Sequence, residues 1–433
     1  MKKIHYLLVF LVICLEACRF ENTPILVKAD YEKYLQPIAV SASMTFEKQE
    51  IDFWEKKMQN GNRSYIFLTK IAKQLESKFR KSGHIQDLMQ ARSLLLEANQ
   101  DAQEREASIY QLLALNSITR HAFQEAKQYL MKATTIHPKN EITKLILADV
   151  YLELGETEQT NSLLNSFKQK QNFDVMVRKA KLLDHQGKLD ETIKLMEQAL
   201  VLISTYNNKT FEIWTLTNLA DFYGHAGQVK KSYEFYLKTL AIDNQNDYAL
   251  KGLAWIAYAH DKNLEEAKRL LTFIASRNQS PEYNLKLAEI ASYEGNEIAK
   301  NKYLQAFKQE TEKPVYGDMY NTYLHELYAD EWGDFEKAHQ IAMREIENRP
   351  TAQSYALLAW TFYKQGVYQK AYEIAEKQVK GKTHEPHVAM QLGFIYQKVN
   401  RKNEANAYFQ NALASSFELG LVATKSIQKA LKN

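Results

Sequence analysis

The side chains that could carry out chemistry in this chain are few and scattered. Histidines cluster only in His384-Glu385-Pro386-His387, where two imidazoles and a carboxylate could bind a transition metal. Pro386 places this motif at a helix start, and two histidines without further ligands are more often surface residues. The sequence has no glycine-rich phosphate loop, nucleophile elbow, zinc-binding histidine pair on one helix or cysteine–histidine dyad. We therefore expect no enzyme, no catalytic residue, no metal site and no cofactor.

The first 18 residues have the features of an export signal. Lys2 and Lys3 precede an apolar run of about ten residues over 6–15, too short to cross a bilayer, which needs about 20. Both cysteines of the chain, Cys14 and Cys18, lie in this segment. A disulfide framework or a thiolate metal site is therefore excluded from the rest of the chain.

The apolar run ends in Leu15-Glu16-Ala17-Cys18, which resembles the lipobox of bacterial lipoproteins. In that family a peptidase cuts before the cysteine, and the thiol carries a diacylglycerol. The resemblance implies that 1–18 is a lipoprotein signal peptide that ends at a lipidated Cys18. It also implies that the protein lies in the bacterial cell envelope. Glu16 departs from the pattern, which usually has a small or hydroxyl residue there, and an ordinary signal peptide or an uncleaved anchor is the alternative. Arg19, in place of the aspartate that retains some lipoproteins at the inner membrane, favours the outer membrane, with its periplasmic or surface side left open.

The composition favours an all-helical protein with no charge excess. A chain of 433 residues with 45% hydrophobic residues, 14 Gly and 7 Pro has too few breakers for an all-β fold. Without Lys2, Lys3 and Glu16, the 56 basic and 52 acidic residues become 54 and 51. This balance gives no electrostatic reason to bind nucleic acid or acidic lipid.

A period of about 34 residues runs through most of the chain. A leucine followed by a small residue recurs, and a glycine follows seven positions later in most copies, with Asn400 in its place in the last copy. The pairs are Leu113-Ala114, Leu147-Ala148, Leu219-Ala220, Leu253-Ala254, Leu287-Ala288, Leu358-Ala359 and Leu392-Gly393.

This pattern resembles the tetratricopeptide repeat family, in which each unit is two antiparallel helices. The best copy has Tyr110, Leu113 and Ala114, followed by Ala126, Leu130, Ala133 and Pro138. Small residues at the eighth and twentieth places let the two helices approach to about 8 Å. The resemblance implies an all-α, right-handed α-solenoid of tetratricopeptide-like helix pairs, which offers a binding surface and no catalytic centre.

The domain boundaries follow from where the period begins and ends. We expect a tether over 19–45, degenerate helical repeats forming an N-terminal cap over 46–106, about nine repeats over 107–418 and a capping helix over 419–433. A polar-faced cap keeps such an array soluble.

One copy breaks the pattern, because His325 and Glu326 occupy the places of the leucine and the small residue. We expect this helix to shift its register so that Leu324, Leu327 and Tyr328 face the core. The alternative is a buried His325–Glu326 pair that senses pH or kinks the superhelix.

In the resembled family the concave groove is lined by fixed places of the first helix of each repeat. Aromatic side chains on that face suggest a ligand, because Tyr and Trp dominate binding hot spots, although packing against the next repeat is the alternative. The candidate protein- or peptide-binding residues are Trp214, Asn218, Asp221, His225, Lys251, Trp255, Tyr258, Tyr320, Tyr323, Trp360, Tyr363, His387 and Phe394.

The sequence thus predicts a non-enzymatic, lipid-anchored scaffold that binds another protein or an extended peptide in its groove. A clamp for a peptide carboxylate is not expected, because Trp255 stands where chaperone-binding relatives have asparagine, four residues after Lys251. The alternatives are a glycan-binding outer-membrane lipoprotein of a nutrient-uptake system and an outer-membrane assembly factor.

Overall fold

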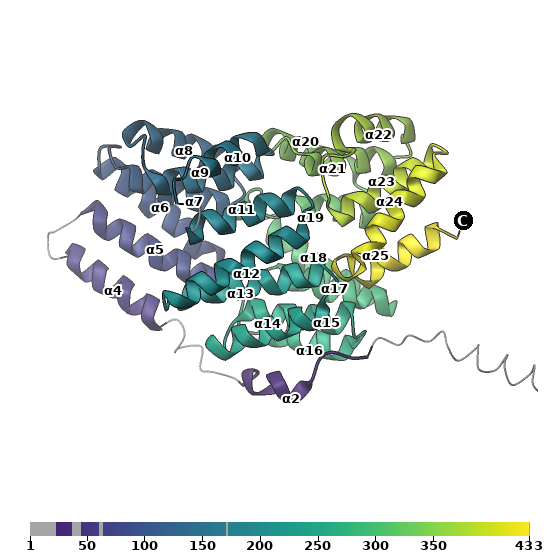
Figure 1. Cartoon of the computed structure of the whole chain (residues 1–433), viewed down its shortest axis with the longest axis horizontal. Coiled ribbons are helices and arrows are strands. Elements are labelled where there is room, and N and C mark those ends of the chain that lie inside the picture. The colour runs from purple at the N-terminus through teal and green to yellow at the C-terminus, as the bar shows by residue number, and fades with distance from the viewer. Residues whose placement is uncertain (1–22, 37–44, 60–63, 170–171, 433) are drawn as a thin grey trace, which may run out of the picture.

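The computed structural model describes residues 23–36, 45–59, 64–169 and 172–432, and these form an all-α solenoid of antiparallel helix pairs (Figure 1). Each pair packs on the next along the chain. The first five pairs are α5 (Tyr65–Ser82) with α6 (Ile85–Asp101), α7 (Ala107–Thr119) with α8 (Phe123–Ile136), α9 (Glu141–Glu153) with α10 (Thr157–Asn165), α11 (Phe173–His185) with α12 (Leu189–Thr205), and α13 (Lys209–His225) with α14 (Val229–Ile242).

The later half continues the same succession of pairs. These pairs are α15 (Asp247–Ala259) with α16 (Leu264–Ala275), α17 (Glu282–Glu294) with α18 (Glu297–Thr311), α19 (Asn321–Glu326) with α20 (Phe335–Asn348), α21 (Ala352–Lys364) with α22 (Tyr368–Ile374), and α23 (Pro386–Lys398) with α24 (Lys402–Ala414). The remaining elements are α2 (Lys28–Tyr31), η1 (Glu32–Tyr34), α4 (Thr45–Gln59), η2 (Pro314–Tyr316), the π-helical turns η3 (Leu327–Glu331) and η4 (Ala375–Val379), and α25 (Ser416–Ala430).

Small residues allow the two helices of a pair to touch. Ala148 on α9 is fully buried, and it shares a core cluster with Leu164 of α10. Thr160 takes the place of the second small residue, and its hydroxyl donates to the Ala148 carbonyl at 3.4 Å and to the Glu156 carbonyl at 3.1 Å. Thr192 repeats this contact with the carbonyl of Ala180 at 3.3 Å. Threonine is tolerated there because its hydroxyl finds an acceptor on the facing helix.

The first helix of a pair ends, as predicted, at a residue whose backbone adopts the left-handed conformation. Gly187 has φ +72°, and Asn400, which replaces glycine in the last copy, has φ +61°. His121 occupies the corresponding position of the first copy at φ +57°. Asparagine tolerates this conformation better than most side chains, and glycine adopts it at no steric cost.

The solenoid turns far enough for early and late repeats to touch. The Asn348 side chain donates to the carbonyl of His121 at 2.5 Å and accepts from the Phe123 amide at 3.1 Å. The Gln279 amide donates to the carbonyl of Ser82 at 2.6 Å. Because these partners are about 200 residues apart in sequence, one superhelical turn closes on itself around a central space.

The two ends of the described chain pack on this closed turn. Within the segment 19–45, where we expected a tether, residues 23–36 lie against α14 and α16, with Tyr31 buried. That part of the expected tether is therefore docked and not free. Helix α25, where a capping helix was expected over 419–433, packs on α13, α15, α17 and α23. It therefore covers part of the inner wall as well as the end of the array.

The irregular repeat shows the expected register shift. Leu324, Leu327 and Tyr328 are buried, which confirms that prediction. The π-helical turn η3 begins directly after α19, and its wider turn changes the register by which the following residues face the core. His325 is also buried, but its Nε2 lies 2.8 Å from the Thr361 hydroxyl, so Thr361 and not Glu326 is its hydrogen-bond partner.

Replacement of Ala148 by tryptophan tests the phase of the repeats. Because Ala148 is buried between α9 and α10, a large ring there should lower the free energy of unfolding by about 1 to 3 kcal/mol or more through overpacking. The measurement is thermal or urea unfolding, with Gln159→Trp on the exposed face of α10 as the matched control. Equal stability of the two variants would contradict the phase.

A second prediction concerns acid stability. Burial lowers the pKa of His325 to about 3, whereas an unfolded histidine titrates near pH 6.5. The unfolded chain therefore binds one more proton between these values, so stability should fall as the pH falls from about 6.5 to about 3, by up to about 1.4 kcal/mol per pH unit. His325→Gln removes this proton, and its urea-unfolding free energy should depend less steeply on pH over that window. Parallel pH curves for the wild type and the variant would refute the assignment.

Candidate binding site

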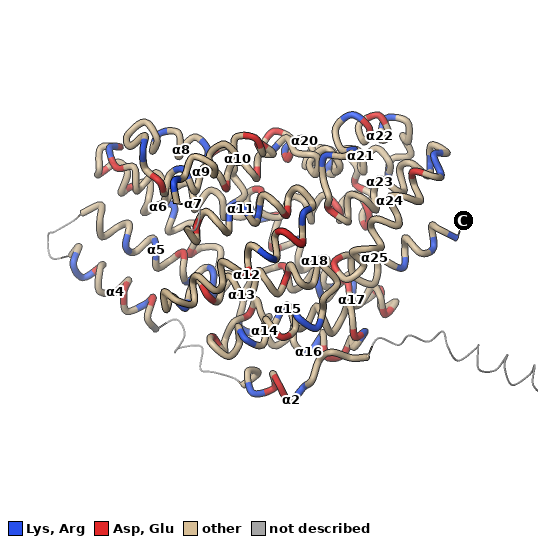
Figure 2. The backbone as a smooth tube through the Cα atoms, viewed as in Figure 1, with Lys and Arg blue, Asp and Glu red and all other residues tan. Residues whose placement is uncertain are grey.

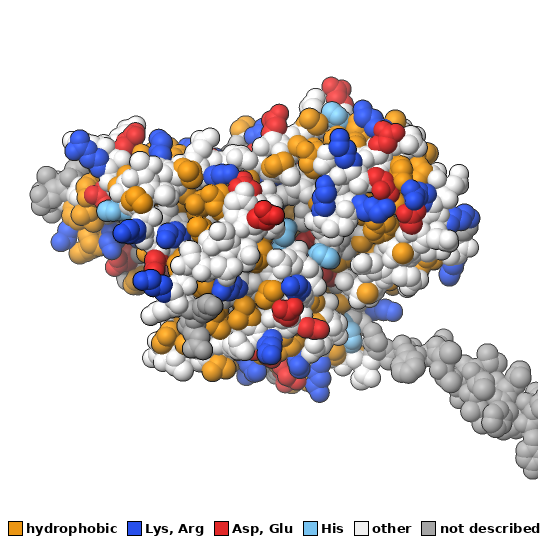
Figure 3. All heavy atoms as spheres, turned by 45° about the horizontal axis from the view of Figure 1, so that its top comes forward, with side chains coloured by type: hydrophobic (Ala, Val, Ile, Leu, Met, Phe, Trp, Pro, Cys, Tyr) orange, Lys and Arg blue, Asp and Glu red, His pale blue; other side chains and the backbone are white. Residues whose placement is uncertain are grey.

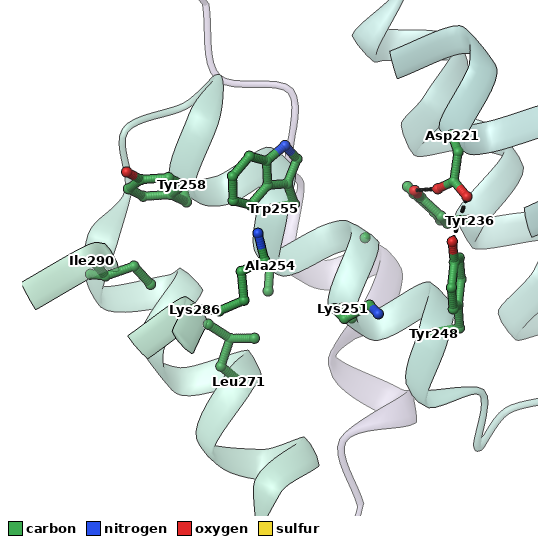
Figure 4. Close-up of a pocket in the computed structure, with 11 residues that line it drawn as sticks. Asp221, Tyr236, Tyr248, Lys251, Ala254, Trp255, Tyr258, Leu271, Lys286 and Ile290 are labelled. Atoms are coloured by element: carbon green, nitrogen blue, oxygen red, sulfur yellow. Dashed lines mark hydrogen bonds between the residues drawn. The ribbon is translucent and has the colours of Figure 1, made fainter. Parts of the chain in front are cut away.

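A pocket of about 160 Å³ opens on the inner wall between α13, α15 and α17; we call it the aromatic pocket (Figure 4). Four of the predicted groove residues, Asp221, Lys251, Trp255 and Tyr258, line it. The rest of its lining is Tyr236, Tyr248, Gly252, Ala254, Leu271, Lys286 and Ile290.

One end of the pocket is fixed by a carboxylate and two tyrosines. The two oxygens of Asp221 accept hydrogen bonds from the hydroxyls of Tyr236 at 2.5 Å and Tyr248 at 2.6 Å. Burial raises the pKa of Asp221, while both hydrogen bonds act in the opposite direction. Tyr236 reaches this position because it packs on Gly252, where a Cβ would lie only 2.2 Å from the ring. Asp221 therefore shapes the pocket and has no carboxylate oxygen left without a hydrogen bond.

Two lysines lie at the mouth of the pocket. Lys286 places its ammonium 4.0 Å from the centre of the Trp255 ring, and Lys251 lies 4.7 Å from the centre of the Tyr248 ring. Such cation–π contacts contribute about 0.5 to 1 kcal/mol at exposed positions. Lys251 also pairs with Glu282 at 3.1 Å. Lys286 pairs with Glu289 at 3.8 Å. Each ammonium group therefore has an acidic partner within the protein.

The chain's own C-terminal helix covers one side of Trp255. The indole Nε1 donates to the Phe417 carbonyl at 2.9 Å, and Gly420 of α25 packs on the ring. Gly420 has φ +77° and interrupts the helix, which bends α25 along the wall. Tyr258 is only 1% exposed. Packing, the alternative that the sequence left open, therefore describes Tyr258, because α25 lies against it.

The second predicted aromatic group packs within the protein. Trp360 is only 6% exposed, stacks on Tyr363 with ring centres 4.6 Å apart, and lies 6.2 Å from Phe394. Its Nε1 donates to the carboxylate of Asp330 at 3.0 Å. Packing, the alternative that the sequence left open, describes Trp360, and its ring face is not free for a ligand.

The remaining predicted aromatic and amide residues are divided between packing and solvent. Trp214 makes an edge contact with Phe173, and the Asn218 amide donates to the Trp214 carbonyl at 2.7 Å. Tyr320 packs on Phe307, whereas the neighbouring Tyr323 is 47% exposed.

A larger space of about 650 Å³, the central polar cavity, lies where early and late repeats meet. Figure 3 shows histidine side chains near the middle of the visible face. Burial raises the pKa of Asp184 and Glu418, and nearby Glu385 adds to both shifts. The charged residues and histidines that line the central polar cavity are Glu153, Lys181, Asp184, His185, His225, Glu326, Arg349, His384, Glu385, His387 and Glu418.

The cavity brings together groups from distant parts of the sequence. His225 of α13 and His387 of α23 were both predicted on the groove face, and both line it. Among the described residues, no cluster of three or more histidine, cysteine or acidic side chains has a geometry that could hold a metal ion. The arrangement suits hydrogen bonding to a polar ligand.

Sequence reasoning missed Tyr236, Lys286 and the inner-wall contact of α25. Tyr236 sits on the second helix of its repeat, outside the groove places, and only the unusual Gly252 opposite it hints at the contact. Lys286 lies one place before the Leu287-Ala288 pair and resembles any exposed helix lysine.

Comparison by sequence finds no matching family model and no matching curated protein. Among solved structures, PilF of Pseudomonas aeruginosa is 17% identical, with a TM-score of 0.36, covering 49% of this chain and 96% of that one. PilW, described as a widely conserved type IV pilus biogenesis factor, is 20% identical, with a TM-score of 0.37 and coverages of 50% and 98%. Human IFIT1, solved as a dimer with m7Gppp-AAAA, is 15% identical, with a TM-score of 0.45 and coverages of 89% and 92%.

Scores of this size are too low for an inference about function. In the part of the chain that the structure describes, no helix is both long enough and apolar enough to cross a bilayer. The helices, packed in consecutive pairs, make this chain an all-α solenoid of tetratricopeptide-like helix pairs.

The contact of α25 with the pocket can be tested at Gly420. In Gly420→Ala the new Cβ would lie 3.0 Å from the Trp255 ring and 2.5 Å from Glu289 Oε1, in a backbone conformation that alanine rarely adopts. We expect α25 to shift and acrylamide to quench tryptophan fluorescence more strongly.

Gly366→Ala is the matched control, because Gly366 has φ +79° and a methyl group added there would meet no other atom within 4 Å. Both variants should lose about 1 to 3 kcal/mol of stability through backbone strain. Only the Gly420 variant should change the quenching, and equal quenching in both would contradict the contact.

Proposed function

We propose that this protein is a lipid-anchored scaffold that binds another protein, through an extended segment, on the inner wall of its solenoid. The observation that carries the proposal is the aromatic pocket, which remains open on that wall although most other predicted groove aromatics are packed internally. A side chain of the partner enters the pocket, and polar groups beside it contact the central polar cavity.

The chemistry of the pocket favours an apolar or aromatic side chain. Trp255, Leu271 and Ile290 supply an apolar floor, whereas Asp221 is already bonded to two tyrosines. Burying such a side chain contributes about 1.5 to 3 kcal/mol. Figure 4 shows the Lys286 side chain lying across the pocket beside Trp255, so a ligand that displaced it would contact the indole face.

The proposed location is the bacterial cell envelope, with the protein held at the outer membrane through a diacylglycerol on Cys18. The support is the lipobox-like sequence Leu15-Glu16-Ala17-Cys18, which lies outside the described residues. Figure 2 shows basic and acidic residues interspersed along the helices, so attachment through a broad basic face has no support in this view. Lipid on Cys18 would supply the attachment instead.

Glycan binding in a nutrient-uptake system and assembly of outer-membrane proteins remain alternatives for the same surface. The Trp360 ring, which would have suited a sugar face, is covered by Tyr363. Peptide binding is therefore preferred.

The test is affinity capture from detergent-solubilised envelope with a pocket-blocking variant. Lys286→Trp places a large ring at the mouth of the pocket and leaves the small residues between paired helices unchanged. We expect capture of the partner to fall at least about tenfold, equivalent to about 1.4 kcal/mol. Lys194→Trp, on an exposed position of α12, is the matched control and should capture normally.

Both variants are first compared with the wild type by thermal unfolding. If Lys286→Trp and Lys194→Trp are both folded and capture the partner equally, binding in the pocket is contradicted. Retention of the wild type on immobilised polysaccharide, abolished by Lys286→Trp, would instead support the glycan alternative.

A further inference from the structure

Residues 23–36, which we call the N-terminal strap, occupy a defined site on the outside of the solenoid. The amides of Ile25 and Leu26 each donate to one oxygen of Asp261, both at 2.9 Å. The Asp261 side chain is only 3% exposed, and His260 contacts it at 2.8 Å. A buried carboxylate is costly without partners, and here the main chain of the strap supplies two of them.

The next residues of the strap continue this specific contact. The Tyr233 hydroxyl accepts from the Val27 amide at 3.2 Å and donates to Asp30 at 2.9 Å. Tyr31 is 1% exposed, and its hydroxyl donates to Glu266 at 2.7 Å. Main-chain and side-chain bonds together fix both the direction and the register of the strap.

Apolar contacts and an ion pair complete the site. Ile25, Leu26, Tyr34 and Leu35 pack against the core formed by α14, α15 and α16. Arg269 of α16 binds Glu32 through both of its terminal nitrogens, at 3.2 and 2.8 Å. Bidentate arginine–carboxylate pairs are geometrically specific. The strap therefore belongs to the folded body.

The electrostatics of Asp261 agree with this docking. Burial alone would raise its pKa, but hydrogen bonds from His260 and from the amides of Ile25 and Leu26 outweigh that effect and lower it. The group thus favours its charged form when the strap is in place.

Docking of the strap limits how far the solenoid can lie from Cys18. Ile25 follows Cys18 by seven positions, and a fully extended chain covers at most about 3.6 Å per residue, which gives about 25 Å. If 19–45 were a free tether, the whole of that segment would separate the solenoid from the anchor. Figure 1 shows α2 beside α14 and α16, at the edge opposite α8 and α22.

We infer that the strap orients the solenoid on the membrane, with the α14–α16 edge nearest the lipid anchor and the α8 and α22 edge facing away. This inference rests on the proposed lipidation of Cys18. It adds a restricted orientation to the proposed scaffold, which keeps the α14–α16 edge toward the bilayer.

The experiment uses the full-length lipoprotein in vesicles of phosphatidylethanolamine and phosphatidylglycerol. Hydrogen exchange of the Ile25 and Leu26 amides measures docking of the strap. Fluorophores attached through Thr272→Cys on α16 or Gln369→Cys on α22 measure proximity to a quencher carried on lipid headgroups. Mass spectrometry of the N-terminal peptide measures lipid on Cys18.

In the wild type we expect both amides to be protected at least about tenfold more than in Tyr31→Ser, and the label on α16 to be quenched several-fold more than the label on α22. Tyr31→Ser should release the strap and bring the two quenching values together. Ala29→Ser, at an exposed position of the strap, is the matched control and should behave as wild type.

The possible failures are distinguishable. Unprotected amides in the wild type would overturn docking of the strap, and equal quenching at the two labels with protected amides would overturn the orientation. Absence of lipid on Cys18 would contradict the proposed anchor, and the orientation with it, while protected amides would still show the strap in its site.

Discussion

The structure depends on the close approach of paired helices at small residues. Ala114, Ala148 and Ala254 are buried where one helix meets the next, and a larger side chain there would separate the backbones. The same kind of contact recurs along the chain, and successive pairs build up a superhelix. The accumulated rotation brings the loop around His121 to Asn348 and so creates the central polar cavity.

Both ends of the described chain are used to finish this architecture. The strap adds to the core of α14–α16 on the outside, and α25 covers part of the inner wall beside Trp255. The aromatic pocket and the central polar cavity lie on the inner side, where Phe417 bonds to Trp255 and Glu418 lines the cavity. A partner on this wall therefore meets a surface that α25 helps to shape.

The fold was predictable because its signals are local. Leucine, a small residue and a left-handed residue recur in phase, and even the irregular repeat showed its register through Leu324, Leu327 and Tyr328. The candidate site was predictable only in part. Helix places put Asp221 and Lys251 among the residues that line the aromatic pocket, and the three-residue spacing of Trp360 and Tyr363 on α21 allows their stacking. Nothing local indicates that α25 covers Tyr258, because that contact depends on the summed rotation of many repeats.

The bonds between early and late repeats change how the array can come apart. An open solenoid behaves as a row of units coupled only to their neighbours, and its ends fray independently. Here the amide of Gln279 is bonded to Ser82 and the side chain of Asn348 to His121, so loosening one repeat removes support from another about 200 residues away. We therefore expect this array to unfold more cooperatively than an open solenoid, because its repeats depend on partners distant in sequence as well as on their neighbours.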